Sequence, residues 1–235
     1  MTISEIAKMI DHSVLHPTAT DADLRKNCAM AMDLHVATVC VKPYHAELAY
    51  TLLKDSDVRV CTVVGFPHGN SETSTKLLEA SIALDDGTSE IDMVVNIGKV
   101  IQEDWDFVDD EIGVINALCK TGNALLKVIF ETDFITSDAH KIRLCELCSE
   151  NQVAFVKTST GFGYVPAGDG HYQYHGATEH DVKLLRKHCS EKVQIKASGG
   201  IKTLEQLLRL YELGSTRFGT SSTDGIMNEA RMKLM

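Results

Sequence analysis

The sequence predicts an α/β fold, namely a (β/α)8 TIM barrel that forms a single domain over residues 1–235. Short apolar segments alternate with helix-patterned segments along the whole chain, and they are apolar on both faces, as in a parallel sheet covered by helices. Eight such units in 235 residues suit a barrel near the lower end of its usual size. The expected strands are Ser13–Leu15, Val36–Val41, Val58–Val64, Ile91–Val95, Leu125–Phe130, Val153–Val156, Val193–Ile195 and Thr216–Phe218.

The expected helices are marked by residues that favour helix ends. Thr20 and Ser137 are good N-cap types, and Thr203 with Gln206 fits a capping box. Gly87 and Gly214 stand where helices should stop. The expected helices include Asp21–Leu34, Glu72–Asp86, Asp104–Lys120, Asp138–Glu150, Glu179–His188 and Leu204–Leu213.

An open doubly wound sheet is the alternative fold. It would favour a G-x-G-x-x-G turn after the first strand, and the sequence has none. One segment, GFGYVPAGDGHYQYHGA, interrupts the alternation after the sixth strand and shows no helix or strand period. We expect an insertion loop over about residues 164–176, with Gly161/Gly163 and Gly168/Gly170 as candidate hinges. In a barrel this loop lies on the catalytic face.

Composition narrows the range of function classes. The formal net charge is −10, and no run of Lys or Arg indicates a nucleic-acid partner. The first residues lack the apolar core of a signal peptide, and no segment is long and apolar enough to cross a membrane. Seven cysteines in such a chain indicate reduced thiols, so we expect a cytoplasmic protein without nucleic-acid or membrane partners.

Charged residues close or occupy several of the apolar strands. The sixth strand ends on Lys157 and the seventh on Lys196, while Asp92 lies in the fourth and Asp11 near the first. A single such lysine has a plain alternative role as a solvated strand end. Two on strands about 4.8 Å apart place like charges together, and this favours one neutral amine. A neutral lysine amine is the nucleophile of Schiff-base chemistry, and Asp92 could pair with a lysine or transfer protons.

Glycine and hydroxyl residues follow the seventh and eighth strands. Ser198, Gly199 and Gly200 precede an expected helix start at Ile201–Thr203, and Gly219-Thr220-Ser221-Ser222 precedes another helical stretch. Glycines let the backbone approach an anion, and helix N-termini direct N–H groups toward it. Barrel enzymes commonly bind phosphate at these two loops, so we expect a phosphate-binding pocket there.

With these motifs the chain resembles the deoxyribose-phosphate aldolases. The resemblance covers nearly the whole sequence in one order, and the pair of lysine motifs is its most specific part. The matching segments are IDHSVLHP, ATVCVKP, CTVVGFPHG, EIDMVVNIG, VAFVKTSTGF, QIKASGGI and RFGTSS.

The resemblance implies a cytoplasmic, homo-oligomeric (dimeric or tetrameric) class I aldolase without metal or other cofactor. It would cleave 2-deoxy-D-ribose 5-phosphate to D-glyceraldehyde 3-phosphate and acetaldehyde. Lys157 would form the Schiff base, Lys196 would favour its neutral amine, and Asp92 would relay protons with a bound water. Asp11 would hold the lysine network. Further substrate contacts are implied for Cys40, Gly161, Gly199, Gly200, Gly219, Ser221 and Ser222.

The sequence also departs from the family pattern. His16 stands where many members have lysine, the tail lacks the catalytic tyrosine of some members, and the Tyr164–Gly176 insertion adds about eight residues. The insertion leaves open a Schiff-base aldolase for a different acceptor, including an unphosphorylated one. Two weaker alternatives are a non-catalytic barrel that binds a sugar phosphate and a metal-dependent aldolase. The metal ligands would then come from Asp169, His171, His175 and His180.

Overall fold

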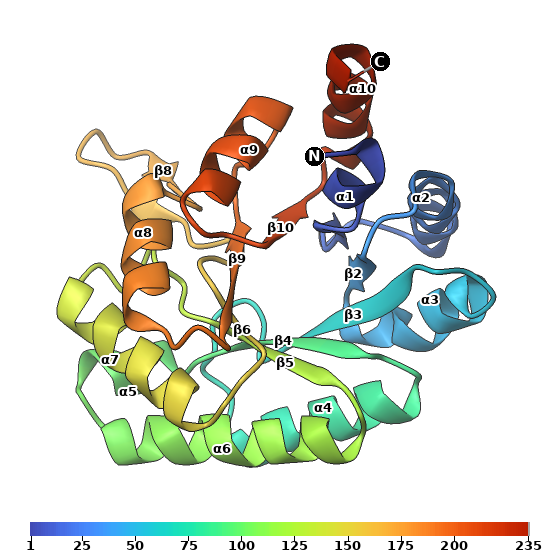
Figure 1. Cartoon of the computed structure of the whole chain (residues 1–235). Helices are drawn as coiled ribbons and strands as arrows, with labels where there is room; N and C mark the ends of the chain where they lie inside the picture. The colour runs from blue at the N-terminus through green and yellow to red at the C-terminus, as the bar shows by residue number, and fades with distance from the viewer. Residues whose placement is uncertain (235) are drawn as a thin grey trace.

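The computed structural model describes residues 1–234 and contains a closed barrel of eight parallel strands (Figure 1). All eight expected strands are present, with ends shifted by a few residues, so the predicted TIM barrel is confirmed. Around the barrel the strand order is β1-β2-β3-β4-β5-β6-β9-β10, and β10 pairs with β1. The strands are β1 (Ile10–Val14), β2 (Thr38–Val41), β3 (Arg59–Val64), β4 (Glu90–Val94), β5 (Leu125–Ile129), β6 (Phe155–Lys157), β9 (Gln194–Ser198) and β10 (Arg217–Thr220).

Helices surround the barrel and begin where the capping residues predict. Thr20, Ser137 and Thr203 are the N-caps of α2, α7 and α9, and Thr203 forms a complete capping box with Gln206. The expected ranges of α2, α7 and α8 match residue for residue. The helices are α1 (Ile3–Ala7), α2 (Asp21–Leu34), α3 (Ala46–Leu53), α4 (Thr73–Asp85), α5 (Ile97–Ile101), α6 (Trp105–Thr121), α7 (Asp138–Glu150), α8 (Glu179–His188), α9 (Leu204–Glu212) and α10 (Thr223–Leu234), with a 3-10 turn, η1, at Pro43–His45.

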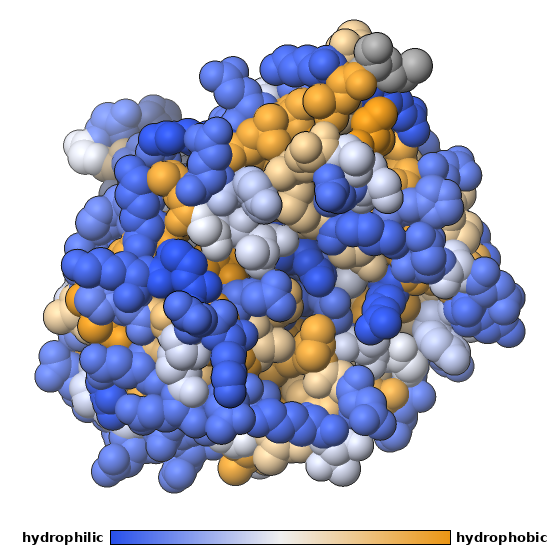
Figure 2. Space-filling view, viewed as in Figure 1, coloured by the Kyte–Doolittle hydropathy of each residue, from blue (hydrophilic) through white to orange (hydrophobic). Residues whose placement is uncertain are grey.

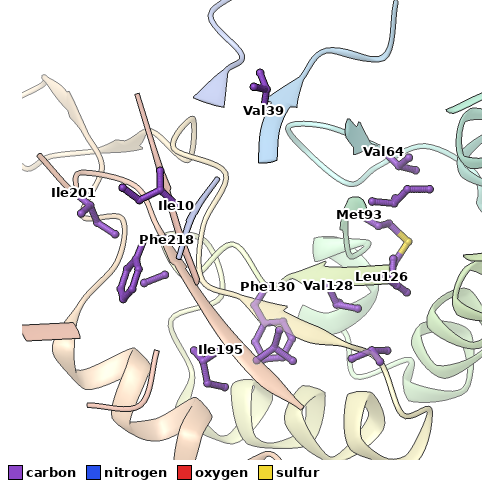
Figure 3. Packing of buried hydrophobic residues seen from close by; sticks show 14 of the residues in the cluster. Ile10, Val39, Val64, Met93, Leu126, Val128, Phe130, Ile195, Ile201 and Phe218 are labelled. Carbon is purple, nitrogen blue, oxygen red and sulfur yellow. The ribbon is translucent and has the colours of Figure 1, made fainter. Parts of the chain in front are cut away.

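The hydrophobic core lies between the barrel and its helices. Met93, Val128, Ile195 and Phe218 belong to one buried cluster that lies along the strands (Figure 3). Because side chains alternate along a strand, the residues next to these four point to the opposite face, into the barrel. Those neighbours include Asp92, which is fully buried. The barrel interior is therefore charged at the level where barrel enzymes usually pack branched apolar side chains.

The insertion contains a short antiparallel hairpin, which corrects the expectation of a segment without strand structure. Strands β7 (Val165–Pro166) and β8 (Tyr172–Gln173) pair two residues each. A ladder of two residues is too short to give a period-2 hydrophobic pattern. The hairpin projects from the barrel beside α8 (Figure 1).

The surface seen in Figure 2 is mostly hydrophilic, in keeping with the acidic composition. Hydrophobic side chains gather over α10, where Met232 and Leu234 are exposed. Within residues 1–234, no helix has the length and apolar character needed to cross a lipid bilayer.

A buried ion pair joins α4 and α6 to the end of β4. Lys76 Nζ lies 2.8 Å from Glu111 Oε1 and donates a 2.8 Å hydrogen bond to the Val94 carbonyl. Glu111 Oε2 accepts a 3.0 Å hydrogen bond from the Asn96 backbone N–H. Both charged side chains are fully buried, so this pair fixes the chain just beyond Asp92.

Lys76→Met should lower the free energy of unfolding by about 3 kcal/mol, because it leaves the Glu111 carboxylate buried without its counter-charge. Lys99→Met is the matched control, since Lys99 forms a partly exposed 2.7 Å ion pair with Asp104 and should cost under about 1 kcal/mol. Urea denaturation measures both values. Equal losses for the two variants would contradict the role assigned to Lys76.

Candidate active site

A pocket of about 620 Å³ opens where β1, β6, β9 and β10 end. It is large enough for a small phosphorylated metabolite. The pocket lies on the face where barrel active sites are found, at the carboxyl ends of the strands. Seven of the residues expected in the site line it, namely Lys157, Gly161, Gly199, Gly200, Gly219, Ser221 and Ser222.

The two strand-end lysines meet at one aspartate beneath this pocket. Lys157 and Lys196 are register partners on β6 and β9. The Nζ atom of each lysine lies 2.7 Å from Asp92 Oδ2. Lys196 also lies 2.5 Å from Asp11 Oδ2. The structure therefore brings together the four charged residues expected in the site.

Three further charged residues complete this interior ionic cluster, and the sequence reasoning did not assign them to the site. Lys127 Nζ lies 2.7 Å from both Asp92 Oδ1 and Glu90 Oε2. Arg217 reaches Asp11 at 2.6 Å and Glu90 at 2.8 Å. The sequence did carry a signal for Lys127, because this residue is a charge in the middle of an apolar strand. The structure places it in register with Asp92. The cluster comprises the cations Lys127, Lys157, Lys196 and Arg217 and the carboxylates Asp11, Glu90 and Asp92.

Mutual pairing keeps most of this cluster charged despite burial. Burial favours the neutral acid of Asp92, but Lys127, Lys157 and Lys196 outweigh it and hold the pKa of Asp92 well below its ordinary value. Burial likewise disfavours the ammonium form of Lys196, yet Asp11 and Asp92 raise its pKa above the ordinary value. The pKa of Lys127 is also raised, because the carboxylates outweigh desolvation.

Hydrogen bonds from side-chain hydroxyl groups connect the loops after β6 and β9, which follow Lys157 and Lys196. Thr158 Oγ1 donates to the Ser198 carbonyl at 3.1 Å and accepts from the Ser198 N–H at 3.1 Å. Ser198 Oγ donates in turn to the Ser159 carbonyl. On the other side, Thr160 donates its backbone N–H and its hydroxyl to Glu131. These bonds hold the backbone that carries Lys157 and the glycine pair after β9.

The glycines at the pocket wall have conformational and steric reasons to be glycine. Gly199 and Gly200 have φ of 94° and 77°, where other residues are strained. At Gly219 a Cβ would lie 2.9 Å from the Ser198 Cβ and 3.3 Å from Lys196 Cε. The helix start expected at Ile201–Thr203 falls at the end of that range, because Thr203 is the N-cap and α9 begins at Leu204, as in the expected helix Leu204–Leu213. Thr203 and Gln206 form the expected capping box, and three residues separate the glycine pair from the helix.

Comparison with known proteins identifies the family to which this site belongs. The profile of the DeoC/LacD family aldolases matches residues 5–214. The chain is 44% identical over 230 residues to deoxyribose-phosphate aldolase of Rhodopirellula baltica, covering 98% of this chain and 91% of the relative. The enzyme of the same name from Thermococcus gammatolerans is also 44% identical, with 97% of each chain covered. The chain belongs to the deoxyribose-phosphate aldolases of the DeoC/LacD family.

Solved structures of aldolases share this barrel. The tetrameric deoxyribose phosphate aldolase of Aeropyrum pernix superposes with a TM-score of 0.86 at 26% identity, covering 100% of this chain and 94% of that one. An aldolase named QR15 gives a TM-score of 0.87 at 34% identity, with 97% of each chain covered. The family resemblance inferred from the sequence motifs is therefore confirmed.

Cys40 does not reach the pocket wall of this aldolase. It is buried in a small cluster with Leu15, Cys61 and Val63, against which Phe162 packs. Cys61 Sγ lies 3.2 Å from Asp92 Oδ1 and accepts a 3.2 Å hydrogen bond from Lys127. Ligand atoms of Cys40, Cys61 and Asp92 lie within 4.8 Å of one another. The lysines already occupy both oxygens of Asp92, so the electrostatics of this aldolase oppose a cation there.

Two histidines near the insertion of this aldolase pair with different aspartates through their rings, and a third contacts an aspartate through its backbone. His175 Nδ1 lies 3.4 Å from Asp133, and His180 Nε2 lies 2.8 Å from Asp138. The backbone N–H of His171 donates to Asp169. Within residues 1–234, two groups of three Cys, Asp or Glu side chains bring their potential metal-ligand atoms together. Both groups lie in the barrel interior. The proposed ligand set of Asp169, His171, His175 and His180 is not brought together.

The interior ionic cluster predicts how the stability of this aldolase depends on pH. The folded-state pKa values of Asp92 and Asp11 are lowered, by Lys127 and Lys196 among others and against the effect of burial. These carboxylates stabilise the fold above their unfolded pKa near 3.9, and the contribution is lost as the pH falls toward the folded pKa. The free energy of unfolding should therefore fall steadily below about pH 4.

Urea denaturation between about pH 7 and about pH 2.5 tests this dependence. Asp11→Asn should weaken it, whereas Asp55→Asn, at an exposed position, should leave it unchanged. A free energy that stays constant down to pH 3 would show that the cluster does not contribute in this way.

Proposed function

We propose that the protein is a class I aldolase that cleaves 2-deoxy-D-ribose 5-phosphate to D-glyceraldehyde 3-phosphate and acetaldehyde. One observation carries the proposal. Of the four cations in the interior ionic cluster, Lys157 lines the pocket and contacts a single carboxylate, that of Asp92. The other three cations contact two or more carboxylates each.

The charge balance of the cluster supports Lys157 as the nucleophile. Four cations share three carboxylates, so one cation is not matched by a negative charge. Lys157 has the fewest carboxylate contacts of the four cations, so it is the lysine that the carboxylates hold least strongly. A neutral amine beside the pocket is the species that attacks an aldehyde carbon.

The reaction uses this amine in four steps. Lys157 Nζ attacks C1 of the open-chain sugar, and water leaves to give a protonated imine. The C3 hydroxyl then loses its proton, and the C2–C3 bond breaks to release D-glyceraldehyde 3-phosphate. The electron pair of that bond moves toward the iminium and forms an enamine. Protonation at C2 and hydrolysis return acetaldehyde and free Lys157.

Proton transfer in these steps is assigned to Asp92 with a bound water. Asp92 Oδ2 is 2.7 Å from Lys157 Nζ and 2.7 Å from Lys196 Nζ. Lys127, Lys157 and Lys196 hold its pKa low against burial, so Asp92 stays ionised and can accept a hydrogen bond from the water that carries the proton. Asp11 holds Lys196 in place through its 2.5 Å contact. Cys40 lies beneath the pocket, in the buried cluster that includes Cys61.

The phosphate group is assigned to the glycine and serine residues at the pocket wall. Gly199 and Gly200 precede α9, and Ser221 and Ser222 directly precede α10. Backbone N–H groups at the start of α10 favour anions, and the glycines after β9 let the backbone approach one closely. Gly161 and Gly219 leave room for this approach. The pocket also includes Lys202, an exposed cation.

The proposal also covers domain organisation, location and oligomeric state. Residues 1–235 act as one aldolase domain that carries the 164–176 insertion. The enzyme is cytoplasmic and forms a homo-oligomer, either a dimer or a tetramer. All seven cysteines are free and buried, which suits a reducing compartment. The exposed apolar side chains on α10 favour a contact between subunits.

The deciding experiment measures acetaldehyde release from 2-deoxyribose 5-phosphate in the presence of EDTA, with unphosphorylated 2-deoxyribose in parallel. EDTA-insensitive cleavage that is much faster for the phosphate ester supports the Schiff-base mechanism and the phosphate site together. Absence of cleavage by folded protein contradicts the proposal. Preferential cleavage of the unphosphorylated sugar favours the alternative acceptor that the insertion left open.

A further inference from the structure

The insertion places two tyrosines in the wall of the active-site pocket. Tyr164 immediately precedes β7 and Tyr174 immediately follows β8, so the two stand opposite each other at the base of the hairpin. Both line the pocket. Their ring centroids are 5.2 Å apart with an interplanar angle of 69°, an edge-to-face contact. The hairpin thus presents an aromatic pair to the pocket.

The base of the hairpin is fixed against the glycine pair after β9. The buried Asp133 carboxylate accepts hydrogen bonds from the backbone N–H groups of His175 at 2.5 Å and Gly176 at 3.0 Å. Ala177 donates its N–H to the Gly199 carbonyl at 3.1 Å. At Gly176 a Cβ would lie 2.5 Å from that same carbonyl, so glycine permits the close approach. These contacts hold Tyr174 near Gly199 and Gly200, where the phosphate is assigned.

The hydroxyl groups of both tyrosines are available for a ligand. Within residues 1–234, neither hydroxyl forms a hydrogen bond with another protein group, whereas Tyr44 donates to the Ala19 carbonyl. A phenol O–H is a good donor to an anionic oxygen, and hydrogen bonds to charged groups are the stronger ones. Lys202 lines the same pocket and adds positive charge.

We propose that Tyr164 and Tyr174 bind the phosphate of the substrate through their hydroxyl groups and so select the phosphorylated sugar. The inference rests on the proposed function and adds a phosphate-recognition element to it. In this proposal the insertion selects the phosphorylated sugar and does not open the site to a different acceptor.

The test compares Tyr164→Phe, Tyr174→Phe and the double variant, which lose the hydroxyls and keep the rings. For 2-deoxyribose 5-phosphate we expect KM to rise about threefold in each single variant and about tenfold in the double variant, with kcat within about twofold. Turnover of unphosphorylated 2-deoxyribose should not change. Tyr172→Phe is the matched control, because Tyr172 lies on the same hairpin, is exposed and does not line the pocket.

Calorimetric titration with inorganic phosphate gives a readout independent of turnover, and the double variant should bind it about tenfold more weakly. An unchanged KM and unchanged phosphate affinity would overturn the proposal, as would an equal loss for the two sugars. If the wild-type protein binds phosphate through these hydroxyls but does not cleave the sugar phosphate, the proposed function fails and the tyrosine site stands.

Discussion

Lys157→Ala is expected to reduce the cleavage of 2-deoxyribose 5-phosphate by about four orders of magnitude or more. The variant lacks the amine that forms the imine, and none of the other three cations of the interior ionic cluster lines the pocket. The fold should persist, because Asp92 keeps its contacts with Lys127 and Lys196. Circular dichroism and thermal denaturation check the fold, and acetaldehyde release measures the activity.

Chemical trapping locates the nucleophile directly. Treatment of the wild-type enzyme with acetaldehyde and sodium borohydride should reduce the imine and add one ethyl group to Lys157, as found by peptide mass spectrometry. Lys183→Ala, which removes an exposed lysine on α8, is the control and should keep full activity and full labelling. Near-normal activity of Lys157→Ala, or an ethyl group on another lysine, would contradict the mechanism.

Lys196→Leu has the second largest expected effect, about a 10³-fold loss of kcat at neutral pH. In the wild-type cluster, four cations share three carboxylates, and the surplus positive charge favours one neutral amine. Without Lys196 the three remaining cations balance the three carboxylates, so the cluster no longer favours a neutral amine. The lost kcat should be partly recovered as the pH is raised from about 7 to about 9, because a higher pH favours the neutral form of a lysine amine.

The pH profile separates this electrostatic role from a structural one. A variant that is merely distorted should lose activity equally at every pH, whereas the electrostatic role shifts the profile of kcat toward alkaline pH. Lys192→Leu is the control, since it removes an exposed lysine just before β9. A Lys196→Leu enzyme with an unshifted profile would contradict the charge-balance argument.

The secondary structure was largely predictable from local patterns. The ranges of α2, α7 and α8 follow from their apolar spacing and from N-caps whose side chains bond the first turn. The hairpin in the insertion was not predictable in this way, because β7 and β8 pair only two residues each. Its position depends on Asp133, which follows β5 in the sequence and binds the insertion from outside it.

The candidate site was only partly predictable. The lysines that end two neighbouring strands, Lys157 and Lys196, stood out because charge at such positions is unusual, and their register brings them together. Glu90 and Arg217 were not assigned, although they form a 2.8 Å ion pair. They lie on β4 and β10, which are not neighbours in the barrel, so no pattern along a single strand or between adjacent strands indicates their contact.

The sequence by itself determined the order of strands and helices, the family and the strand-end lysines, because hydrophobic period, capping and motif spacing are local properties. Only the tertiary structure decided which lysine has a single carboxylate contact. That outcome depends on closure of the barrel, which places Lys127 and Arg217 among the carboxylates of other strands. Coulombic interactions depend on distance in space, and charges far apart in the chain therefore set the balance at Lys157.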